Sequence, residues 1–210
     1  MLTNITQIIL KSMKVLRRRE DGSAIVEYAI LLPIFLTMTI GAFELGHIYM
    51  VNASLEGAVT ESTRTAMTGN LPEPYASRSA YIEDLVRASL AIAGVTTGIT
   101  ISLNVYESFA SIGKPEPFVD QDGNLQYDPG ECYTDINANM SWDADMGSTG
   151  AGAGENIMIM KVDIVLPYIT GFMRTIMQGK TAINLSTSTA VKNEPFGGST
   201  WEAGNNVICT

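Results

Sequence analysis

The stretch of the sequence best suited to chemistry is an acidic segment that spans residues 120–145. It contains seven carboxylates and no lysine or arginine: Asp120, Asp122, Asp128, Glu131, Asp135, Asp143 and Asp145. Oxygen ligands that recur at short, regular intervals are what a hard cation such as Ca2+ requires. The spacing of these residues therefore favours cation binding over acid–base catalysis by paired carboxylates.

The first half of the segment has the spacing of a calcium loop. Its candidate ligands are Asp120, Asp122, Asn124, Asp128 and Glu131 at loop positions 1, 3, 5, 9 and 12, and the carbonyl of Gln126 at position 7. Leu125 stands at position 6, where an EF-hand has glycine, and Gly123 stands at position 4 instead. No pair of helices is predicted around the loop, so we expect an isolated calcium loop rather than an EF-hand switch.

The second half of the segment repeats this spacing without the closing glutamate. Its candidate ligands are Asp135, Asn137, Asn139, Ser141 and Asp143, which predict a weaker second site. The alternative is an acidic, turn-rich surface insertion over residues 116–155 that binds no ion. Repulsion among the carboxylates would then disfavour a compact loop.

The two cysteines are Cys132, within the acidic segment, and Cys209, next to the C-terminus. Two cysteines are too few for a disulfide scaffold, and their separation matches no metal-ligand spacing. A disulfide between them is allowed if this part of the chain lies outside the cytoplasm, and it would hold the C-terminal tail against the acidic segment. The alternative is two free thiols.

Other features argue against catalysis and against nucleic-acid binding. His47 is the only histidine, and it follows an apolar run rather than lying in a predicted pocket beside an acid. The sequence contains no phosphate loop and no dinucleotide-binding fingerprint. The net charge of −9 argues against a nucleic-acid binder, which requires a basic face to meet phosphates. We therefore expect no catalytic residue and no nucleic-acid partner.

An apolar run over about residues 24–46 predicts one membrane-spanning helix. No charge occurs between Tyr28 and Phe43, and extension to Glu27 and Glu44 gives roughly the 20 residues that a span needs. The residues before the run are rich in lysine and arginine and those after it are acidic, which predicts a cytoplasmic N-terminus and an external C-terminal domain. No small-residue cleavage site follows the run, as a secretory signal would require. An uncleaved signal anchor fits the same charge pattern.

Glu27 is unusual because a carboxylate just inside the hydrocarbon costs a few kcal/mol. If the chain were cut after Gly22, Ser23 would carry a free amine and Glu27 would be the fifth residue of the mature chain. That amine could neutralise Glu27 of a neighbouring subunit when the helices pack in register. The alternative is that Glu27 reaches the cytoplasmic headgroups near the end of the span.

The stretch "RRREDGSAIVEYAILLPIFLTMTIGAFELG" resembles the processing site and N-terminal helix of type IV prepilins. More narrowly, it resembles the TadE-like proteins of the tight-adherence (Flp, type IVc) pilus system. The residues that carry the resemblance are Gly22, Glu27, Tyr28, Pro33, Gly41, Glu44 and Gly46. Far downstream, "STAVKNEPF" (188–196) is similar to a C-terminal signature of some members.

The resemblance implies a minor pilin or pseudopilin of the bacterial inner membrane. It implies cleavage by a prepilin peptidase between Gly22 and Ser23, and subunit assembly through Glu27, Tyr28 and Pro33. The implied partners are other pilin and pseudopilin subunits, the peptidase, the pilus assembly platform and membrane lipid. Incorporation into a surface pilus is a further implication.

The rest of the chain predicts an α+β fold. A helix is expected from 23 to about 67, which Pro33 should bend or locally melt and which Gly69 should end. A second helix is expected over 76–93, and alternating strands over 99–109, 157–168 and 181–193, with a loop or short helix at 169–180. The expected fold is type IV pilin-like, with a long helix packed on a small antiparallel sheet that carries the calcium-loop-like insertion.

Two functions follow from these patterns. The first is a pilin-type assembly protein with a leader over residues 1–22, a long helix over 23–69 and a periplasmic domain over 70–210. The second is an uncleaved single-pass protein whose calcium-stabilised outer domain binds a ligand or a surface. Cleavage of the leader distinguishes the two.

Overall fold

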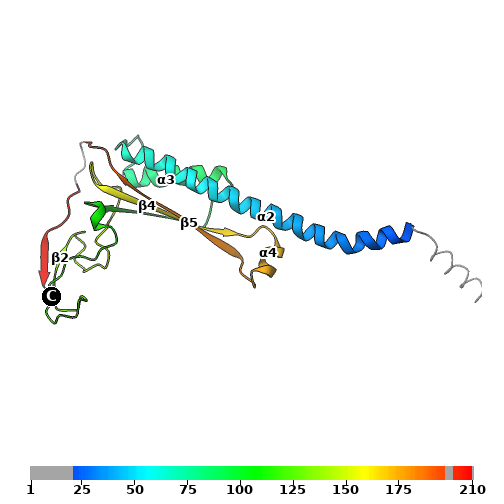
Figure 1. Cartoon of the computed structure of the whole chain (residues 1–210). Helices are drawn as coiled ribbons and strands as arrows, with labels where there is room; N and C mark the ends of the chain where they lie inside the picture. Colours follow the sequence, from blue (N-terminus) through cyan, green and yellow to red (C-terminus); the bar gives the residue numbers. More distant parts are fainter. Residues whose placement is uncertain (1–20, 197–200, 210) are drawn as a thin grey trace, which may run out of the picture. The chain divides into compact units, whose positions relative to one another are not determined.

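A computed structural model describes residues 21–196 and 201–209 of the chain (Figure 1). Residues 1–20, and with them most of the expected leader, lie outside the described residues. The chain forms two compact units. The first contains residues 21–47 and Tyr168–Thr181, and the second contains Ile48–Pro167 and the residues from Ala182 onward.

Helix α2 (Asp21–Met67) has 47 residues and contributes to both units. It continues through Pro33 without interruption, so the helix is not locally melted there, although proline supplies no N–H to the helix. The helix stops before Gly69, which adopts the left-handed conformation with φ +69° and donates its N–H to the carbonyl of Ala66. This is a common way for a helix to end, and it is the one that the sequence predicted.

The main sheet contains four antiparallel strands in the order β3-β1-β4-β5. Strands β1 (Ile99–Tyr106), β4 (Ile157–Pro167) and β5 (Ala182–Lys192) lie within the three predicted ranges. The sequence missed β3 (Ser148–Thr149), which is only two residues long. The antiparallel α+β fold that the sequence predicted is thus confirmed.

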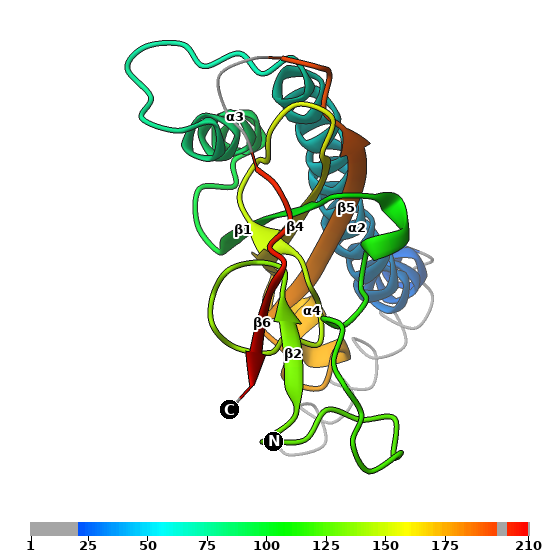
Figure 2. The ribbon, with the colours of Figure 1, turned by 90° about the vertical axis from the view of Figure 1, so that its left-hand side faces the viewer.

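One face of this sheet packs against α3 (Arg78–Ile92) and the second half of α2, which lie side by side (Figure 2). The core they enclose contains Val51, Leu55, Ala58, Val59, Ala66, Ile82, Val86, Leu90, Val95, Leu103, Ala151, Met158, Met160, Val162, Ile164 and Leu166. Each fully buried large apolar side chain stabilises the fold by about 1.5–3 kcal/mol. Because α2 supplies part of this core, the second unit includes residues 48–67 in addition to the residues from 70 onward.

Four shorter elements complete the described structure around the loops. Strands β2 (Cys132–Asp135) and β6 (Asn206–Cys209) form a separate antiparallel pair (Figure 2), and the sequence predicted neither. A single 3-10 turn, η1 (Phe109–Ser111), follows β1. Helix α4 (Gly171–Ile176) lies between β4 and β5 and belongs to the first unit, where a loop or a short helix was expected.

Candidate functional site

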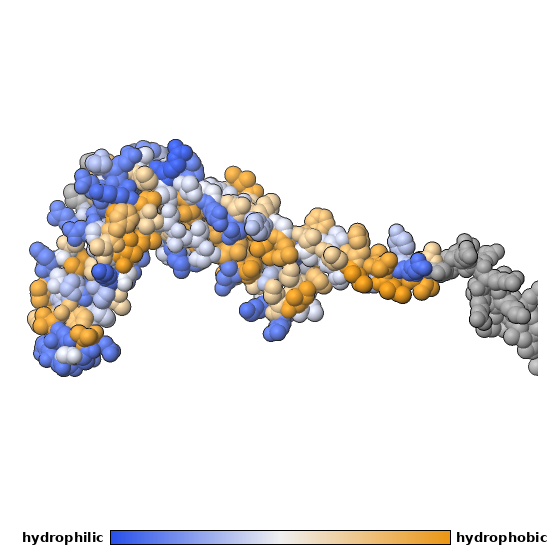
Figure 3. Space-filling model, viewed as in Figure 1, coloured by the Kyte–Doolittle hydropathy of each residue, from blue (hydrophilic) through white to orange (hydrophobic). Residues whose placement is uncertain are grey.

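The first half of α2 is apolar and exposed. Within α2 lies a stretch long and apolar enough to cross a membrane, and none of it is buried in the protein. Its large exposed apolar side chains are Ile25, Val26, Tyr28, Ile30, Leu31, Leu32, Ile34, Phe35, Leu36, Met38, Ile40 and Phe43. Figure 3 shows that the visible face of this part of the helix is largely hydrophobic. A contiguous apolar surface of this kind marks contact with a membrane or with other proteins.

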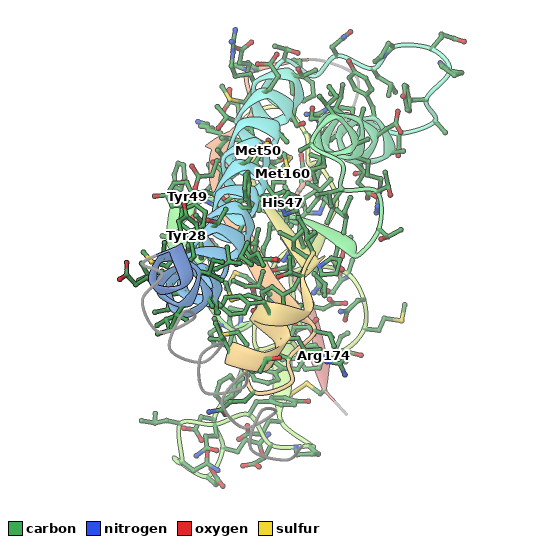
Figure 4. All side chains as sticks on the ribbon, turned by 90° about the vertical axis from the view of Figure 1, so that its right-hand side faces the viewer. Tyr28, His47, Tyr49, Met50, Met160 and Arg174 are labelled. Carbon is green, nitrogen blue, oxygen red and sulfur yellow. A yellow bond between two sulfur atoms is a disulfide. The ribbon has the colours of Figure 1, made fainter. Side chains whose placement is uncertain are left out.

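The residues predicted for processing and assembly all lie on this part of α2. Gly22 and Ser23 are in its first turn, and Glu27 and Tyr28 follow on an exposed stretch. Tyr28 is labelled in Figure 4. Tyr28 is 73% exposed, so its ring is available to another molecule. Pro33 lies in the helix interior.

Glu44 holds the segment Tyr168–Thr181 against α2 within the first unit. Its carboxylate is only 1% exposed. It accepts hydrogen bonds from the N–H of Ile169 at 2.8 Å, and from the N–H and hydroxyl of Thr170 at 3.0 and 2.7 Å. Gly41, one turn earlier on the same face, lies against the ring of Phe172. The Gly-x-x-Glu part of the sequence motif therefore docks α4 onto the helix.

The first acidic loop is organised around Asp120. This carboxylate accepts the N–H groups of Gly123 at 2.7 Å and Leu125 at 2.9 Å, and the hydrogen bond from Leu125 is the main reason why the pKa of Asp120 lies below its ordinary value. Carboxylate oxygens of Asp120, Asp122 and Glu131 lie within 4.8 Å of one another.

The amide of Asn124 donates to both Asp122 and Asp128, at 3.0 and 2.6 Å. Gln126 also belongs to the loop, and its N–H donates to the side-chain oxygen of Asn124 at 2.6 Å. The structure thus gathers the six predicted residues in one loop.

The second acidic loop reproduces the first, fifteen positions later. Asp135 accepts the N–H groups of Asn139 and Met140, as Asp120 accepts those of Asn124 and Leu125. The amide of Asn139 donates to Asp143 at 2.6 Å, the same distance as from Asn124 to Asp128. Asn137 also donates to Asp143, and the N–H of Ser141 donates to Asn139.

Both loops adopt the left-handed backbone conformation at position 6. Leu125 has φ +62° and Met140 has φ +65°, where an EF-hand uses glycine for its sharp turn. Position 4 is also left-handed in both, with φ +80° at Gly123 and φ +61° at Ala138. The absence of glycine at position 6 therefore does not prevent the turn, although an L residue there carries some strain.

A buried glutamate closes each loop. Glu131 accepts the N–H groups of Gln121 at 2.8 Å and Asp128 at 3.0 Å. In the second loop the corresponding N–H groups, fifteen positions later, belong to Ile136 and Asp143, and both donate to Glu116, at 2.7 and 3.1 Å. Glu116 is completely buried and Glu131 is 5% exposed. The sequence reasoning found no closing glutamate for the second loop because Glu116 precedes that loop instead of following it.

Aromatic stacking pairs the two loops. The rings of Tyr127 and Trp142, again fifteen positions apart, stack with centroids 4.6 Å apart and an interplanar angle of 13°. Phe118 meets both rings edge-on, at 6.0 and 6.1 Å. The indole N–H of Trp142 donates to the carbonyl of Glu116 at 3.0 Å, which links the stack to the closing glutamate. The two loops therefore pack against each other as a pair.

A disulfide joins Cys132 and Cys209, which are 77 residues apart in the sequence. It connects β2 to β6, where these cysteines are directly opposite each other. Cys132 follows Glu131 directly, and β2 ends at Asp135, the first residue of the second loop. The disulfide thus ties the C-terminal strand to the segment between the two loops.

These features define a class of protein: a long helix, apolar and exposed over its first half, that carries an α+β unit on its second half. This is the layout of a membrane-anchored protein with a pilin-like fold. A family model described as TadE-like protein matches residues 22–64, so the resemblance that the sequence motif predicted is confirmed over α2. No curated protein and no solved structure matches the chain.

Proposed function

We propose that this protein is a minor pilin or pseudopilin that takes part in the assembly of a tight-adherence (Flp) type IV pilus. The observation that carries the proposal is the TadE-like match to residues 22–64. These residues lie within α2, whose two halves differ in their surroundings. The first half exposes its apolar side chains, and the second half builds the core of the second unit, here called the outer unit. Such a helix can pack against other subunits without loss of its own fold.

A prepilin peptidase would process the chain between Gly22 and Ser23. The new amine of Ser23 would then lie about one helical turn from the position of Glu27. In a low-dielectric environment an ammonium–carboxylate pair between neighbouring subunits offsets the cost of burying either charge alone. The pair would also fix the relative register of the helices, because any axial shift separates the charges.

The proposed topology places the N-terminus in the cytoplasm and the α+β unit in the periplasm. The basic residues before α2 support this orientation, namely Lys11, Lys14, Arg17, Arg18 and Arg19. The disulfide between Cys132 and Cys209 supports it independently, because such bonds persist in oxidising compartments.

N-terminal sequencing of the protein from native membranes tests the proposal. A mature chain that begins at Ser23 is expected, and replacement of Gly22 by leucine should block its formation. Glu27→Ala should leave insertion intact but impair pilus assembly, and Glu27→Asp is the control that retains the charge. A functional protein that retains its leader would favour the alternative, an uncleaved single-pass protein with a ligand- or surface-binding outer domain.

We further propose that the paired acidic loops bind Ca2+ and so stabilise the outer unit. The observation that favours this is the repetition of one loop conformation, each copy closed by its own buried glutamate. A carboxylate oxygen that accepts one N–H retains a lone pair for a cation. In the first loop the donors would be Asp120, Asp122, Asn124, Asp128, Glu131 and the carbonyl of Gln126. In the second loop they would be Asp135, Asn137, Asn139, Asp143 and the carbonyl of Ser141, with Glu116 as the closing carboxylate.

A further inference from the structure

The exposed apolar surface of the first unit continues from α2 onto the segment Tyr168–Thr181, here called the α4 hairpin. Ile169, Ile176 and Met177 are 64%, 54% and 41% exposed, whereas Met173 of α4 is buried. The hairpin therefore buries the side chain of Met173 and leaves three other large apolar side chains uncovered.

Glu44 fixes the hairpin at one level along α2. Seventeen residues separate Glu27 from Glu44, which at 1.5 Å per residue is about 26 Å. This is close to the thickness of about 30 Å of a bilayer's hydrocarbon core. If α2 spans the membrane as proposed, Glu44 and the attached hairpin lie at the outer interface, and the buried carboxylate of Glu44 does not face lipid.

The charge of the hairpin differs from that of the chain as a whole. Its only charged residues are Arg174 and Lys180, whereas the chain has a net charge of −9. Both side chains are exposed, and Arg174 is labelled on α4 in Figure 4. Exposed apolar side chains beside basic ones are the composition of segments that lie in the headgroup region of anionic lipids.

We propose that the α4 hairpin lies in the outer headgroup region of the membrane and contacts anionic phospholipid. Ile169, Ile176 and Met177 enter the boundary of the acyl chains, and Arg174 and Lys180 meet phosphate groups. The hairpin then fixes the depth and rotation of α2 in the bilayer. This inference rests on the proposed membrane span.

Spin labelling of the full chain in lipid vesicles tests the inference. The two native cysteines form a disulfide, so a single cysteine can be introduced and labelled with a nitroxide. Labels are compared at Ile176→Cys, at Phe35→Cys within the span and at Ile92→Cys on α3, where the native side chain is 91% exposed. Accessibility to oxygen and to a water-soluble nickel complex is measured in vesicles of phosphatidylcholine with and without phosphatidylglycerol.

In vesicles with phosphatidylglycerol, the label at Ile176 should be several-fold less accessible to the nickel complex than the label at Ile92. The label at Ile176 should remain accessible to oxygen, which dissolves in the acyl chains. Replacement of both Arg174 and Lys180 by glutamine should raise the nickel accessibility of the label at Ile176 towards that of the label at Ile92 in the anionic vesicles, and should leave it unchanged in vesicles of phosphatidylcholine alone. Equal nickel access at Ile176 and Ile92 overturns the inference, and so does protection of Ile176 from both reagents, which would indicate a protein neighbour. If the label at Phe35 is also open to nickel, the proposed span itself fails.

Discussion

Substitution of Glu116 by glutamine separates the structural role of this residue from its proposed role in the second calcium loop. The buried carboxylate accepts three N–H groups, from Ile136, Asn137 and Asp143, at 2.7, 3.3 and 3.1 Å. Glutamine retains one acceptor oxygen, but its NH2 group must face one of these N–H groups. The variant therefore loses the negative charge and leaves a buried donor without an acceptor.

The expected cost follows from these contacts. A hydrogen bond to a charged group contributes about 1.5–3 kcal/mol, and a buried donor without an acceptor costs about 1–3 kcal/mol. Because the glutamine oxygen still accepts hydrogen bonds, part of this hydrogen-bond energy is retained. We therefore expect Glu116→Gln to lower the free energy of unfolding by about 2–4 kcal/mol without calcium. For a unit of this size that corresponds to a Tm lower by roughly 5–15 °C.

Calcium should affect the variant less than the native protein. An ion at 100 times its dissociation constant stabilises a one-site protein by about 2.7 kcal/mol, so two sites give about twice that. Glu116→Gln and Glu131→Gln should each retain about half of this gain. Glu107→Gln, which removes an exposed carboxylate outside the loops, is the matched control and should retain all of it.

The assay is thermal unfolding of the full chain in detergent micelles, in chelator and in millimolar Ca2+. Terbium luminescence excited through Trp142 reports ion binding at the paired loops, because this indole precedes the candidate ligand Asp143 and stacks on Tyr127 of the first loop. If Glu116→Gln gains as much from calcium as the native protein, Glu116 does not close a calcium site. If the native protein gains nothing, the loops are a structural insertion only.

Three further predictions concern the outer unit. Reduction of the Cys132–Cys209 disulfide, or replacement of both cysteines by serine, should lower the free energy of unfolding by about 4 kcal/mol, because the bond closes a loop of 77 residues. Denaturant midpoints that are the same with and without reductant would contradict this. Met160→Ala should lower the free energy of unfolding by about 2–5 kcal/mol because Met160 is completely buried. Met38→Ala is the control: Met38 is 71% exposed on α2, so this variant should leave the denaturant unfolding of the outer unit unchanged. Burial, and secondly a hydrogen bond to Asp145, raises the pKa of Tyr106 to about 12. The protonated phenol therefore contributes its full stabilisation below about pH 10, and this contribution is lost as the pH rises towards 12. Phenylalanine does not ionise, so the stability of Tyr106→Phe should fall less than that of the native protein between these pH values, as measured by denaturant unfolding.

The sequence determined the elements whose pattern is local. Helix α2 follows from a long helical pattern that ends at Gly69, and β1, β4 and β5 follow from the alternation of apolar and polar residues. The spacing of both acidic loops could also be recognised in the sequence, because a calcium loop takes most of its ligands from every second position. The motif around Glu27 and Glu44 sufficed for the TadE-like resemblance.

The tertiary structure decided what joins residues far apart in the sequence. Glu116 and Glu44 both receive backbone N–H groups, and these donors carry no side-chain signature that a sequence could display. The short strands β2 and β6 depend on each other for their hydrogen bonds, so neither has a local pattern of its own. Hence the pattern along the chain determined the two long helices, the long strands and the spacing of the loops. The tertiary structure determined the closing glutamate of the second loop and the partners of the buried carboxylates, because these contacts join residues far apart in the sequence.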